Sequence, residues 1–501
     1  MLALNLRILL DTNVLIPLHD SLVVLQPNLA HVIQLAQGRH QFLYHPASLR
    51  DIQRDMNVQR RDRTLQRLKQ YKALPEGPSC PWSGPTTSVN DACDNSILYA
   101  LSRDAAHVLI TEDRKLHAKA ALRGLASRVY FIQTAEDWLQ RLHEPTEIDV
   151  PNIKDVELHE LTDSLDGDFF DSLRDAYKPF DKWFRKKARD GRHGWIYNHG
   201  DSQKLSALCI YDVQENEKVT DDGLVLSDRA LKLCTFKVAT EVRGRKIGEL
   251  FLKASFKYAT ANACENIFID VGEENHPELV SLLIDFGFFK KGMHNGDAVF
   301  VKEHPIKAPF VDPEKEDHFD YVRRYYPHFR EDLAISKFIV PIRPQYHRIL
   351  FPDYKNNTKI APGEDVQHVG NAIKLAYLSN SPSNRIRRGD IVLFYRTHDE
   401  KAITTLVVVE AFTTIASADK IASLVSRRTV YSEQDIVQMA EDAEGKPYGG
   451  VRVMLFRTIE HLPHPVPRAT LLRKLRVRGQ IQSTRIINDD TFSRILDASG
   501  R

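Results

Sequence analysis

The sequence predicts a multidomain protein of the α/β and α+β classes, with a parallel-sheet domain, a mixed-sheet domain and a C-terminal β-barrel. Three observations lead to this expectation. Strand-like and helix-like stretches alternate near the N-terminus, a strand–turn–helix–strand unit lies mid-chain, and strand-like runs dominate after residue 334. The length of 501 residues also exceeds what one ordinary hydrophobic core organises.

Two stretches without periodicity divide the chain. His143–Asp155 and Lys302–Asp320 are rich in prolines and acidic residues, as linkers are. Domains are therefore expected at residues 1–145, 150–305 and 325–501.

Composition narrows the class of protein. Apolar residues make up 42% and charged residues 27%, as in soluble globular chains, and the net charge of +2 restricts any polyanion site to a local patch. Five cysteines without CxxC spacing favour a reducing compartment rather than a disulfide framework or a zinc site. There is no signal-peptide pattern and no apolar run long enough to cross a membrane, so we expect a cytoplasmic protein without membrane contact.

In the first domain, the alternation of strand-like and helix-like stretches predicts a parallel sheet with helices on its faces. The expected strands are Leu6–Leu10, Gln41–Tyr44, Ala106–Ile110 and Val129–Ile132, and the expected helices are Asn28–Gln37, Leu49–Tyr71, Asp91–Ser102 and Leu116–Leu122. Ligands of such sheets bind beyond the carboxyl ends of the strands.

Acidic residues recur at that edge. Asp11 follows the first strand, Asp51 and Asp94 lie near the starts of helices, and Asp113 follows the strand HVLI. Carboxylates gathered at one edge repel one another unless a hard divalent cation such as Mg²⁺ or Mn²⁺ binds them. Such a cation would ionise a water molecule for phosphoryl displacement.

Helix capping is the alternative for each acid taken singly. Ser48 with Asp51 and Asp91 with Asp94 have capping-box spacing, and Asp113 could cap the helix that follows it.

The stretches LLDTNVLI, DNSILYA and LITED together resemble a PIN-domain ribonuclease over nearly all of residues 3–140. The resemblance implies metal-dependent RNA cleavage. It assigns the catalytic acids to Asp11, Asp51, Asp94 and Asp113, the metal ligands to Asp11, Asp94 and Asp113, and supporting polar roles to Thr111 or Asn13. The second acid is usually Glu, so Asp51 departs from the pattern, and Asp91 is an alternative to Asp94 or a partner of it.

A basic stretch follows Asp51. Its charge either tracks an RNA backbone or forms a solvated helix face. The residues are Arg54, Arg60, Arg61, Arg63, Arg67, Lys69 and Lys72.

The second domain contains a strand (Ala230–Val238), a basic glycine turn (Arg243–Gly248), a helix (Ile247–Ala261) and a strand (Asn266–Val271). Backbone N–H groups at the helix N-terminus, together with the basic side chains, make this turn a candidate anion site.

This order, followed by HPELVSLLIDFGFFKKG, resembles the GNAT N-acetyltransferase superfamily over about residues 155–303. The resemblance implies acetyl-CoA as cofactor and an amine as acceptor. It assigns pyrophosphate binding to Arg243, Gly244, Arg245, Lys246, Ile247 and Gly248, pantetheine pairing to Val238 and Ala239, and a second cofactor motif to Asn275. Lys246 replaces a common glycine, and Leu283 stands where many members have a tyrosine that acts as general acid. Glu241 and Tyr258 are weaker alternatives for that acid.

The third domain is expected to be a closed or nearly closed β-barrel with one or two helices. SKFIVPIRPQYHRIL and RIRRGDIVLFY resemble the ASCH/PUA-like fold, which implies binding of RNA or modified nucleotides. Arginines that could line a cleft, or simply be solvated, are Arg343, Arg348, Arg385, Arg387, Arg388 and Arg396.

The combined prediction is an acetyl-CoA-dependent N-acetyltransferase fused to a metal-dependent RNA endonuclease, with a C-terminal domain that binds RNA or a nucleotide. Two alternatives remain open. The PIN-like domain could be an inactive RNA-binding or regulatory platform for the transferase, or the chain could be a toxin-like stress effector.

Overall fold

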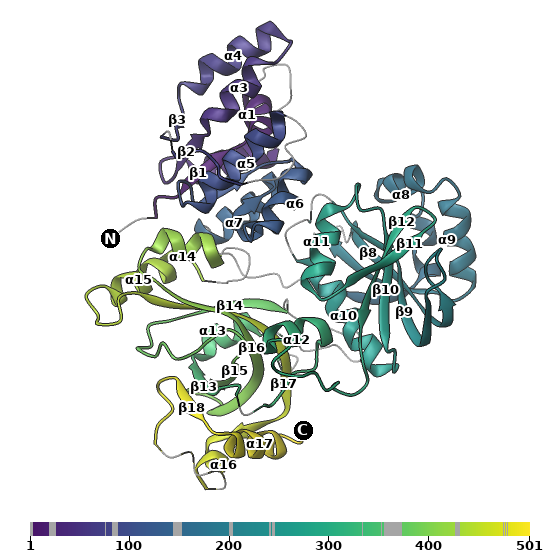
Figure 1. The fold of residues 1–501 in the computed structure, drawn as a ribbon, viewed down its shortest axis with the longest axis vertical. Coiled ribbons are helices and arrows are strands. Elements are labelled where there is room, and N and C mark those ends of the chain that lie inside the picture. Colours follow the sequence, from purple (N-terminus) through teal and green to yellow (C-terminus); the bar gives the residue numbers. More distant parts are fainter. Residues whose placement is uncertain are drawn as a thin grey trace. The chain divides into compact units, whose positions relative to one another are not determined.

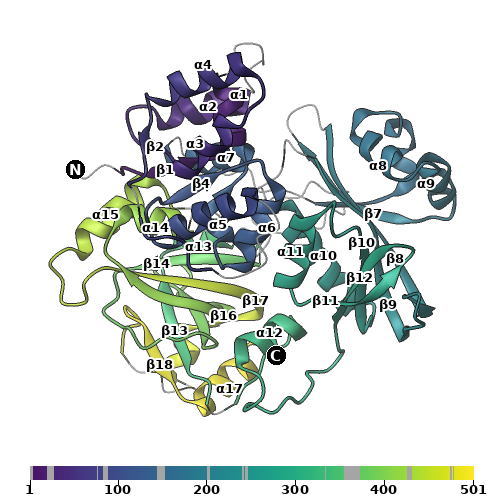
Figure 2. The ribbon, with the colours of Figure 1, turned by 45° about the horizontal axis from the view of Figure 1, so that its top comes forward.

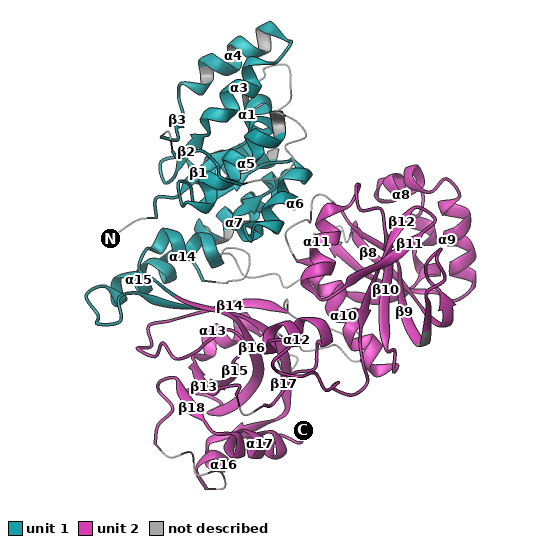
Figure 3. Ribbon diagram, in the orientation of Figure 1, with its two compact units in different colours: residues 1–147, 414–453 teal, residues 148–413, 454–501 magenta. Residues whose placement is uncertain are grey.

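The computed structural model describes the whole chain except residues 1–3, 20–26, 76, 83–88, 144–152, 200–203, 240–241, 243–245, 333, 352, 355–372, 426–430, 474, 476 and 478. The chain forms two compact units (Figure 3). The first unit comprises residues 1–147 and 414–453, and the second unit comprises residues 148–413 and 454–501. The division into three domains at 1–145, 150–305 and 325–501 stays a prediction.

The first unit contains a five-stranded parallel sheet in the order β3-β2-β1-β4-β5 (Figure 1). Its strands are β1 (Arg7–Leu10), β2 (Gln41–Tyr44), β3 (Lys72–Ala73), β4 (Val108–Ile110) and β5 (Val129–Tyr130). Its helices are α1 (Thr12–His19), α2 (Pro27–Ala36), α3 (Pro46–Gln53), α4 (Val58–Leu68), α5 (Val89–Ser102), α6 (Arg114–Leu122), α7 (Ile132–His143), α14 (Ala418–Val425) and α15 (Glu433–Ala443). The predicted parallel sheet is confirmed.

The helix expected over Leu49–Tyr71 is instead two helices, α3 and α4. The side chain of Asp55 accepts a hydrogen bond from the backbone N–H of Asn57 at 3.0 Å. Such local side-chain bonds compete with helical hydrogen bonding and explain the break.

A chain of imidazoles ties α15 to the remainder of the first unit. Leu6 N–H donates to Nδ1 of His40 at 3.3 Å, Nε2 of His40 lies 2.8 Å from Nε2 of His143, and Nδ1 of His143 lies 2.7 Å from a Glu433 carboxylate oxygen. These contacts fix one tautomer for each ring, because His40 must donate to His143 and His143 must donate to Glu433. Both rings are therefore neutral in this arrangement.

This arrangement predicts acid sensitivity of the first unit. Burial, and secondarily His143, lowers the pKa of His40 to about 4. The unfolded chain binds the proton near pH 6.5, so the free energy of unfolding should decrease as pH is lowered from about 6.5 to 4, by up to about 3 kcal/mol. Urea unfolding followed by hydrogen exchange in residues 4–10 measures this slope, and His40→Gln should reduce it. An equal slope in the variant and the wild type would contradict the assignment.

The second unit contains two sheets. The seven-stranded sheet has the order β11-β12-β10-β9-β8-β7-β6, and the six-stranded sheet has the order β14-β17-β16-β15-β13-β18. The strands are β6 (Lys154–Glu157), β7 (His193–His199), β8 (Lys204–Lys218), β9 (Val225–Val238), β10 (Asn266–Val271), β11 (Phe289–His294), β12 (Asp297–Glu303), β13 (Lys337–Ile342), β14 (Lys374–Ser379), β15 (Ile391–Arg396), β16 (Ala402–Ile415), β17 (Val451–Pro467) and β18 (Arg485–Ile487).

The helices of the second unit cover both faces of the seven-stranded sheet. Alternate residues of a strand point to opposite faces, so Ile196 packs with Phe184 of α9, whereas Trp195 belongs to the cluster that contains Phe251 of α10. The helices are η2 (Leu158–Ser164), η3 (Asp168–Phe170), α8 (Asp171–Ala176), α9 (Phe180–Arg189), α10 (Ile247–Ala261), α11 (Pro277–Asp285), α12 (His318–Tyr325), α13 (Pro344–Leu350), α16 (Arg468–Arg473) and α17 (Asp489–Ala498). Figure 2 shows α10 and α11 side by side.

A closed or nearly closed barrel was expected in the C-terminal segment, and the described strands do not form a closed one. The six-stranded sheet has two edges, β14 and β18, which lie at opposite ends of the strand order. β18 is only three residues long, so it offers little backbone for closure.

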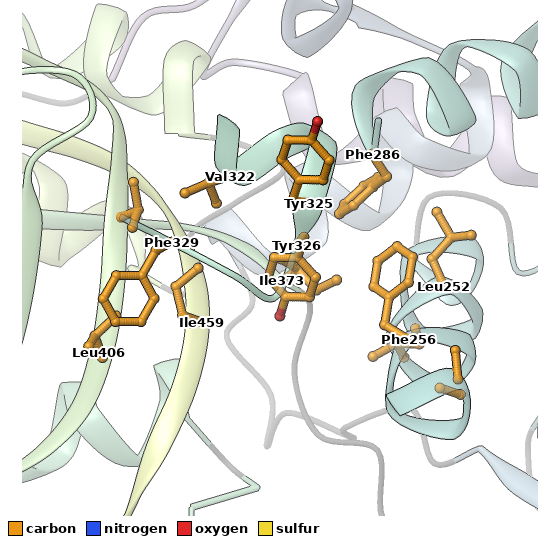
Figure 4. Close-up of a cluster of buried hydrophobic side chains, with 14 of the residues drawn as sticks. Leu252, Phe256, Phe286, Val322, Tyr325, Tyr326, Phe329, Ile373, Leu406 and Ile459 are labelled. Carbon is orange, nitrogen blue, oxygen red and sulfur yellow. The ribbon is translucent and has the colours of Figure 1, made fainter. Parts of the chain in front are cut away.

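One hydrophobic cluster joins α10 and α11 to the C-terminal sheet (Figure 4). Phe256 of α10 lies 5.3 Å from the ring centroid of Tyr326 and 6.3 Å from that of Phe286. Ile373, Leu406 and Ile459 extend the cluster into the C-terminal segment. Burial of this apolar surface stabilises both parts of the second unit together.

In the described part of the chain, no helix has the length and apolar character needed to cross a bilayer.

Candidate functional site

The candidate cofactor site lies where β9 leads into α10. β9 and β10 are parallel, and their paired register runs from Ala230–Asn266 to Leu233–Ile269. β9 continues to Val238, still paired with β8. The two parallel strands therefore separate towards their carboxyl ends, which is where ligands of such sheets bind.

The backbone of β9 presents hydrogen-bonding groups to this gap. Ala239 N–H donates to Ser206 O at 2.9 Å, on the β8 side. Successive residues of a strand direct their backbone N–H and C=O groups to opposite sides. The N–H and C=O groups of Val238 therefore point away from β8, towards the side where β10 has separated. An amide-bearing arm would find its complementary partners there.

The backbone turns sharply at the start of α10 and packs closely against α11. Lys246 caps the helix with φ of 60°, the left-handed region that glycine adopts most readily. Gly248 lies close to α11, since a Cβ at this position would come within 3.0 Å of Leu282 and 3.5 Å of Phe236. Arg243, Gly244 and Arg245 lie outside the described residues, whereas Ile247 begins α10 as expected.

Asn275 lies beyond the carboxyl end of β10. Its backbone N–H donates to Gly272 O at 3.0 Å, in the turn that leads to α11. Since β9 and β10 are parallel, this turn and the N-terminus of α10 share one edge of the sheet. The structure therefore brings Asn275 to the edge where Val238 and Ala239 lie, and its cofactor role stays a prediction.

Tyr258, the one described candidate for a general acid, is not at this edge, and Leu283, which stands in place of the usual tyrosine, cannot act as an acid. Leu283 is fully buried in the hydrophobic cluster. Tyr258 packs against Trp195 and Tyr211, with ring centroids 6.0 and 4.8 Å away. At about 1.5 Å per residue, Tyr258 is about 18 Å along the helix from Lys246. Glu241 lies outside the described residues.

A polar cluster on neighbouring strands was not predicted. Tyr211 donates to Asp155 at 2.7 Å, and Nδ1 of His193 lies 3.0 Å from the other carboxylate oxygen. Burial, followed by the Asp155 contact, raises the pKa of Tyr211 well above its usual value. The three residues come from β6, β7 and β8, so only strand pairing brings them together.

In the first unit, Asp11 lies at the carboxyl edge of the parallel sheet. Its carboxylate accepts hydrogen bonds from the Thr111 hydroxyl at 2.6 Å and from Thr12 N–H at 2.7 Å. The pKa of Asp11 is raised to about 6, chiefly by burial and to a smaller extent by the charges of Asp94 and Asp113, while the two hydrogen bonds oppose the shift. The three acids that the sequence placed at one edge therefore interact electrostatically.

A lysine that sequence reasoning missed supplies countercharge. Lys119 Nζ lies 2.6 Å from carboxylate oxygens of both Asp91 and Asp94. Burial raises the pKa of Asp94, and Lys119 opposes that shift. Lys119 is far from both acids in sequence, so no local pattern indicates the contact.

The capping alternatives are resolved one by one. Asp113 does cap α6, accepting hydrogen bonds from Lys115 N–H at 2.7 Å and Leu116 N–H at 3.2 Å. α3 is capped by His45, so the capping box proposed for Ser48 and Asp51 is wrong. α5 begins at Val89 and includes both Asp91 and Asp94, so Asp91 is not its cap.

Asp51 is linked to Asp11 and Asp94 through Cys93. It pairs with Arg54 at 3.2 Å and is hydrogen-bonded to the thiol of Cys93. Burial is the largest cause of the raised pKa of Cys93, and the bond to Asp51 is the next. The charges of Asp11 and Asp94 raise this pKa as well.

The described residues contain no group of three or more His, Cys, Asp or Glu side chains placed to hold a metal ion. Carboxylate chemistry suits Mg²⁺ or Mn²⁺, yet Asp94 is bound by Lys119 and Asp113 by the α6 N-terminus. The assignment of Asp11, Asp94 and Asp113 as metal ligands stays a prediction.

Two of the expected cleft arginines in the C-terminal segment are neutralised within the chain. Arg388 lies over the Phe319 ring at 4.2 Å and pairs with Asp317 and Asp320 at 3.2 and 3.1 Å. Arg396 is buried and pairs with Asp399 at 2.6 Å. Arg396 is therefore enclosed by its acidic partner, whereas the Arg388 side chain stays 44% exposed while its Nη2 contacts both carboxylates.

No family model matches the sequence, and no curated protein matches it. Among solved structures, an ASCH protein from Zymomonas mobilis is 14% identical with a TM-score of 0.24, covering 32% of this chain and 94% of that one. The PaiA N-acetyltransferase from Thermoplasma acidophilum, solved with coenzyme A, is 15% identical with a TM-score of 0.23, covering 30% and 99%. AtaTR bound with AcCoA is 10% identical with a TM-score of 0.25, covering 31% and 95%.

Proposed function

We propose that the second unit transfers an acetyl group from acetyl-CoA to an amine. The observation that supports this most is the separation of β9 from β10 directly before α10. The gap offers backbone groups of Val238 to a pantetheine arm, and the first turn of α10 offers N–H groups to a pyrophosphate. Arg243, Gly244, Arg245, Lys246, Ile247 and Gly248 would hold the pyrophosphate, with Ala239 and Asn275 beside the arm.

With acetyl-CoA held in this way, the protein's contribution would be positioning. The amine nitrogen attacks the thioester carbonyl carbon, an N–C bond forms, the C–S bond breaks, and the proton that the nitrogen loses ends on the sulfur of the departing coenzyme A. Orientation of the two reactants supplies much of the rate in such a reaction. This fits a site where Leu283 replaces a phenol.

Release of coenzyme A thiol in the presence of a panel of small amines and amino-terminal peptides tests the proposal. Lys246→Glu should remove turnover and weaken acetyl-CoA binding, because it reverses a charge beside the pyrophosphate position and removes the Nζ that donates to the Lys374 carbonyl. Lys291→Glu makes the same charge change on an exposed strand and should leave both unaltered. Absence of acetyl-CoA binding to the wild-type chain would refute the proposal.

A second candidate function belongs to the first unit. We infer that it cleaves RNA with Mg²⁺ or Mn²⁺, because Asp11 and Asp113 follow the paired parallel strands β1 and β4 at one sheet edge, where the charges of Asp94 and Asp113 act on Asp11. Asp11, Asp94 and Asp113 would bind the cation and Asp51 would assist. The cation would supply an ionised water. Binding requires the cation to compete with Lys119 for Asp94.

Calorimetric titration with Mn²⁺ and an RNA cleavage assay test this candidate together. Asp94→Asn should lose both binding and cleavage, and Asp62→Asn, at an exposed site on α4, should keep both. If the wild-type chain retains RNA on a filter but neither binds Mn²⁺ nor cleaves, the first unit is an RNA-binding platform instead.

A further inference from the structure

We propose that Glu249 is a positioning residue for the cofactor, holding the first turn of α10 through Lys374 of the C-terminal sheet. This inference rests on the proposed acetyl-CoA site. Glu249 is the third residue of α10 and is 8% exposed. Its carboxylate accepts a hydrogen bond from Lys374 N–H at 2.5 Å, across 125 positions in the chain.

Lys246 completes the contact from the same turn. Its Nζ donates to the backbone carbonyl of Lys374 at 2.9 Å. The two peptide groups that flank the Cα of Lys374 are therefore bonded to two side chains at the start of α10. We call these two bonds the clasp.

The side chain of Lys374 fastens the second helix of the site. Its Nζ pairs with Asp285, the last residue of α11, and lies 3.7 Å from Glu410 of β16. Arg457 of β17, 1% exposed, donates to the backbone and the side chain of Asp285 at 2.9 and 3.0 Å. Both helices that border the candidate site are thus held by strands of the C-terminal sheet.

The charge of Glu249 has two opposing effects at this position. A negative side chain in the first turn is favoured by the helix dipole, but it repels a pyrophosphate that binds the same helix end. If Glu249 acted only through its charge, neutral variants would bind acetyl-CoA more tightly. If it acts by holding the turn, only a variant that still accepts the Lys374 hydrogen bond keeps the affinity.

The experiment measures the dissociation constant of acetyl-CoA by calorimetry for the wild-type chain, Glu249→Gln and Glu249→Ala. Gln retains an acceptor oxygen, so affinity within about threefold of wild type is expected. Ala loses it and leaves the Lys374 N–H without its partner, so an approximately tenfold weaker affinity is expected. Leu252→Ala, which truncates a buried side chain on the same helix, should leave the affinity of the folded chain unaltered.

Hydrogen exchange of the free chain gives an independent readout. Glu249→Ala should speed exchange of the Lys374 amide, and Glu249→Gln should not. Tighter binding by both neutral variants, or equal binding by all three chains, would overturn the positioning role while leaving the cofactor site standing. No binding by the wild-type chain would instead refute the proposed function and this inference with it.

Discussion

Asp11→Asn is expected to stabilise the first unit by about 3 kcal/mol more at pH 8 than at pH 4. The pKa of Asp11 is raised to about 6 from 3.8, chiefly by burial. A raised carboxyl pKa means that the folded state holds the proton more tightly than the unfolded state. The resulting penalty is absent below about pH 4, grows through pH 6 and is complete above it, and Asn removes it.

Urea unfolding at the two pH values, followed by hydrogen exchange in residues 4–19, measures the difference. Asp62→Asn is the matched control, because the Asp62 side chain is 60% exposed and should respond equally at both pH values. Asp11→Asn should also lose any Mn²⁺ binding, so this variant is expected to combine a loss of function with a gain of stability. An Asp11→Asn effect independent of pH would contradict the burial of an ionisable carboxyl group at this position.

Phe256→Ala is expected to destabilise the second unit by about 3–5 kcal/mol. Phe256 is 2% exposed and packs between Tyr326 and Phe286. Its removal leaves a cavity in the cluster that joins α10 to the C-terminal sheet. Because that cluster is continuous, exchange in α10 and in β17 should accelerate together.

Phe310→Ala serves as control, since Phe310 is 91% exposed and its loss should change the free energy of unfolding by less than about 0.5 kcal/mol. Hydrogen exchange at increasing urea, read separately in residues 247–261 and 451–467, distinguishes the outcomes. Destabilisation of α10 with unaltered exchange in β17 would show that the two parts fold independently.

Periodicity located the elements that bear on the cofactor site. The helix Ile247–Ala261 and the strand Asn266–Val271 were predicted with the bounds that the structure has. The apolar residues of both elements recur with a regular period, and a glycine turn precedes the helix. Both features can be recognised from neighbouring residues alone. The break between α3 and α4 escaped prediction because it depends on the side chain of Asp55 bonding to the backbone.

Most contacts between residues distant in the sequence could not be predicted. Strand-end logic does predict that Asp11 and Asp113, which follow the parallel strands β1 and β4, lie at one edge of the sheet, whereas Asp94 lies within α5. Lys119 between Asp91 and Asp94, and Lys374 against Glu249, have no comparable local rule. The open edges of the six-stranded sheet formed by the described residues likewise depend on strand lengths and edge positions, which apolar runs do not specify.

Hydrogen exchange of the full chain with and without acetyl-CoA tests the central claim most directly. Acetyl-CoA is expected to slow exchange at residues 236–250, where β9 passes into α10, and to leave residues 4–19 unaltered. Unchanged exchange at residues 236–250 under saturating acetyl-CoA, or protection confined to another part of the chain, would contradict the placement of the cofactor site.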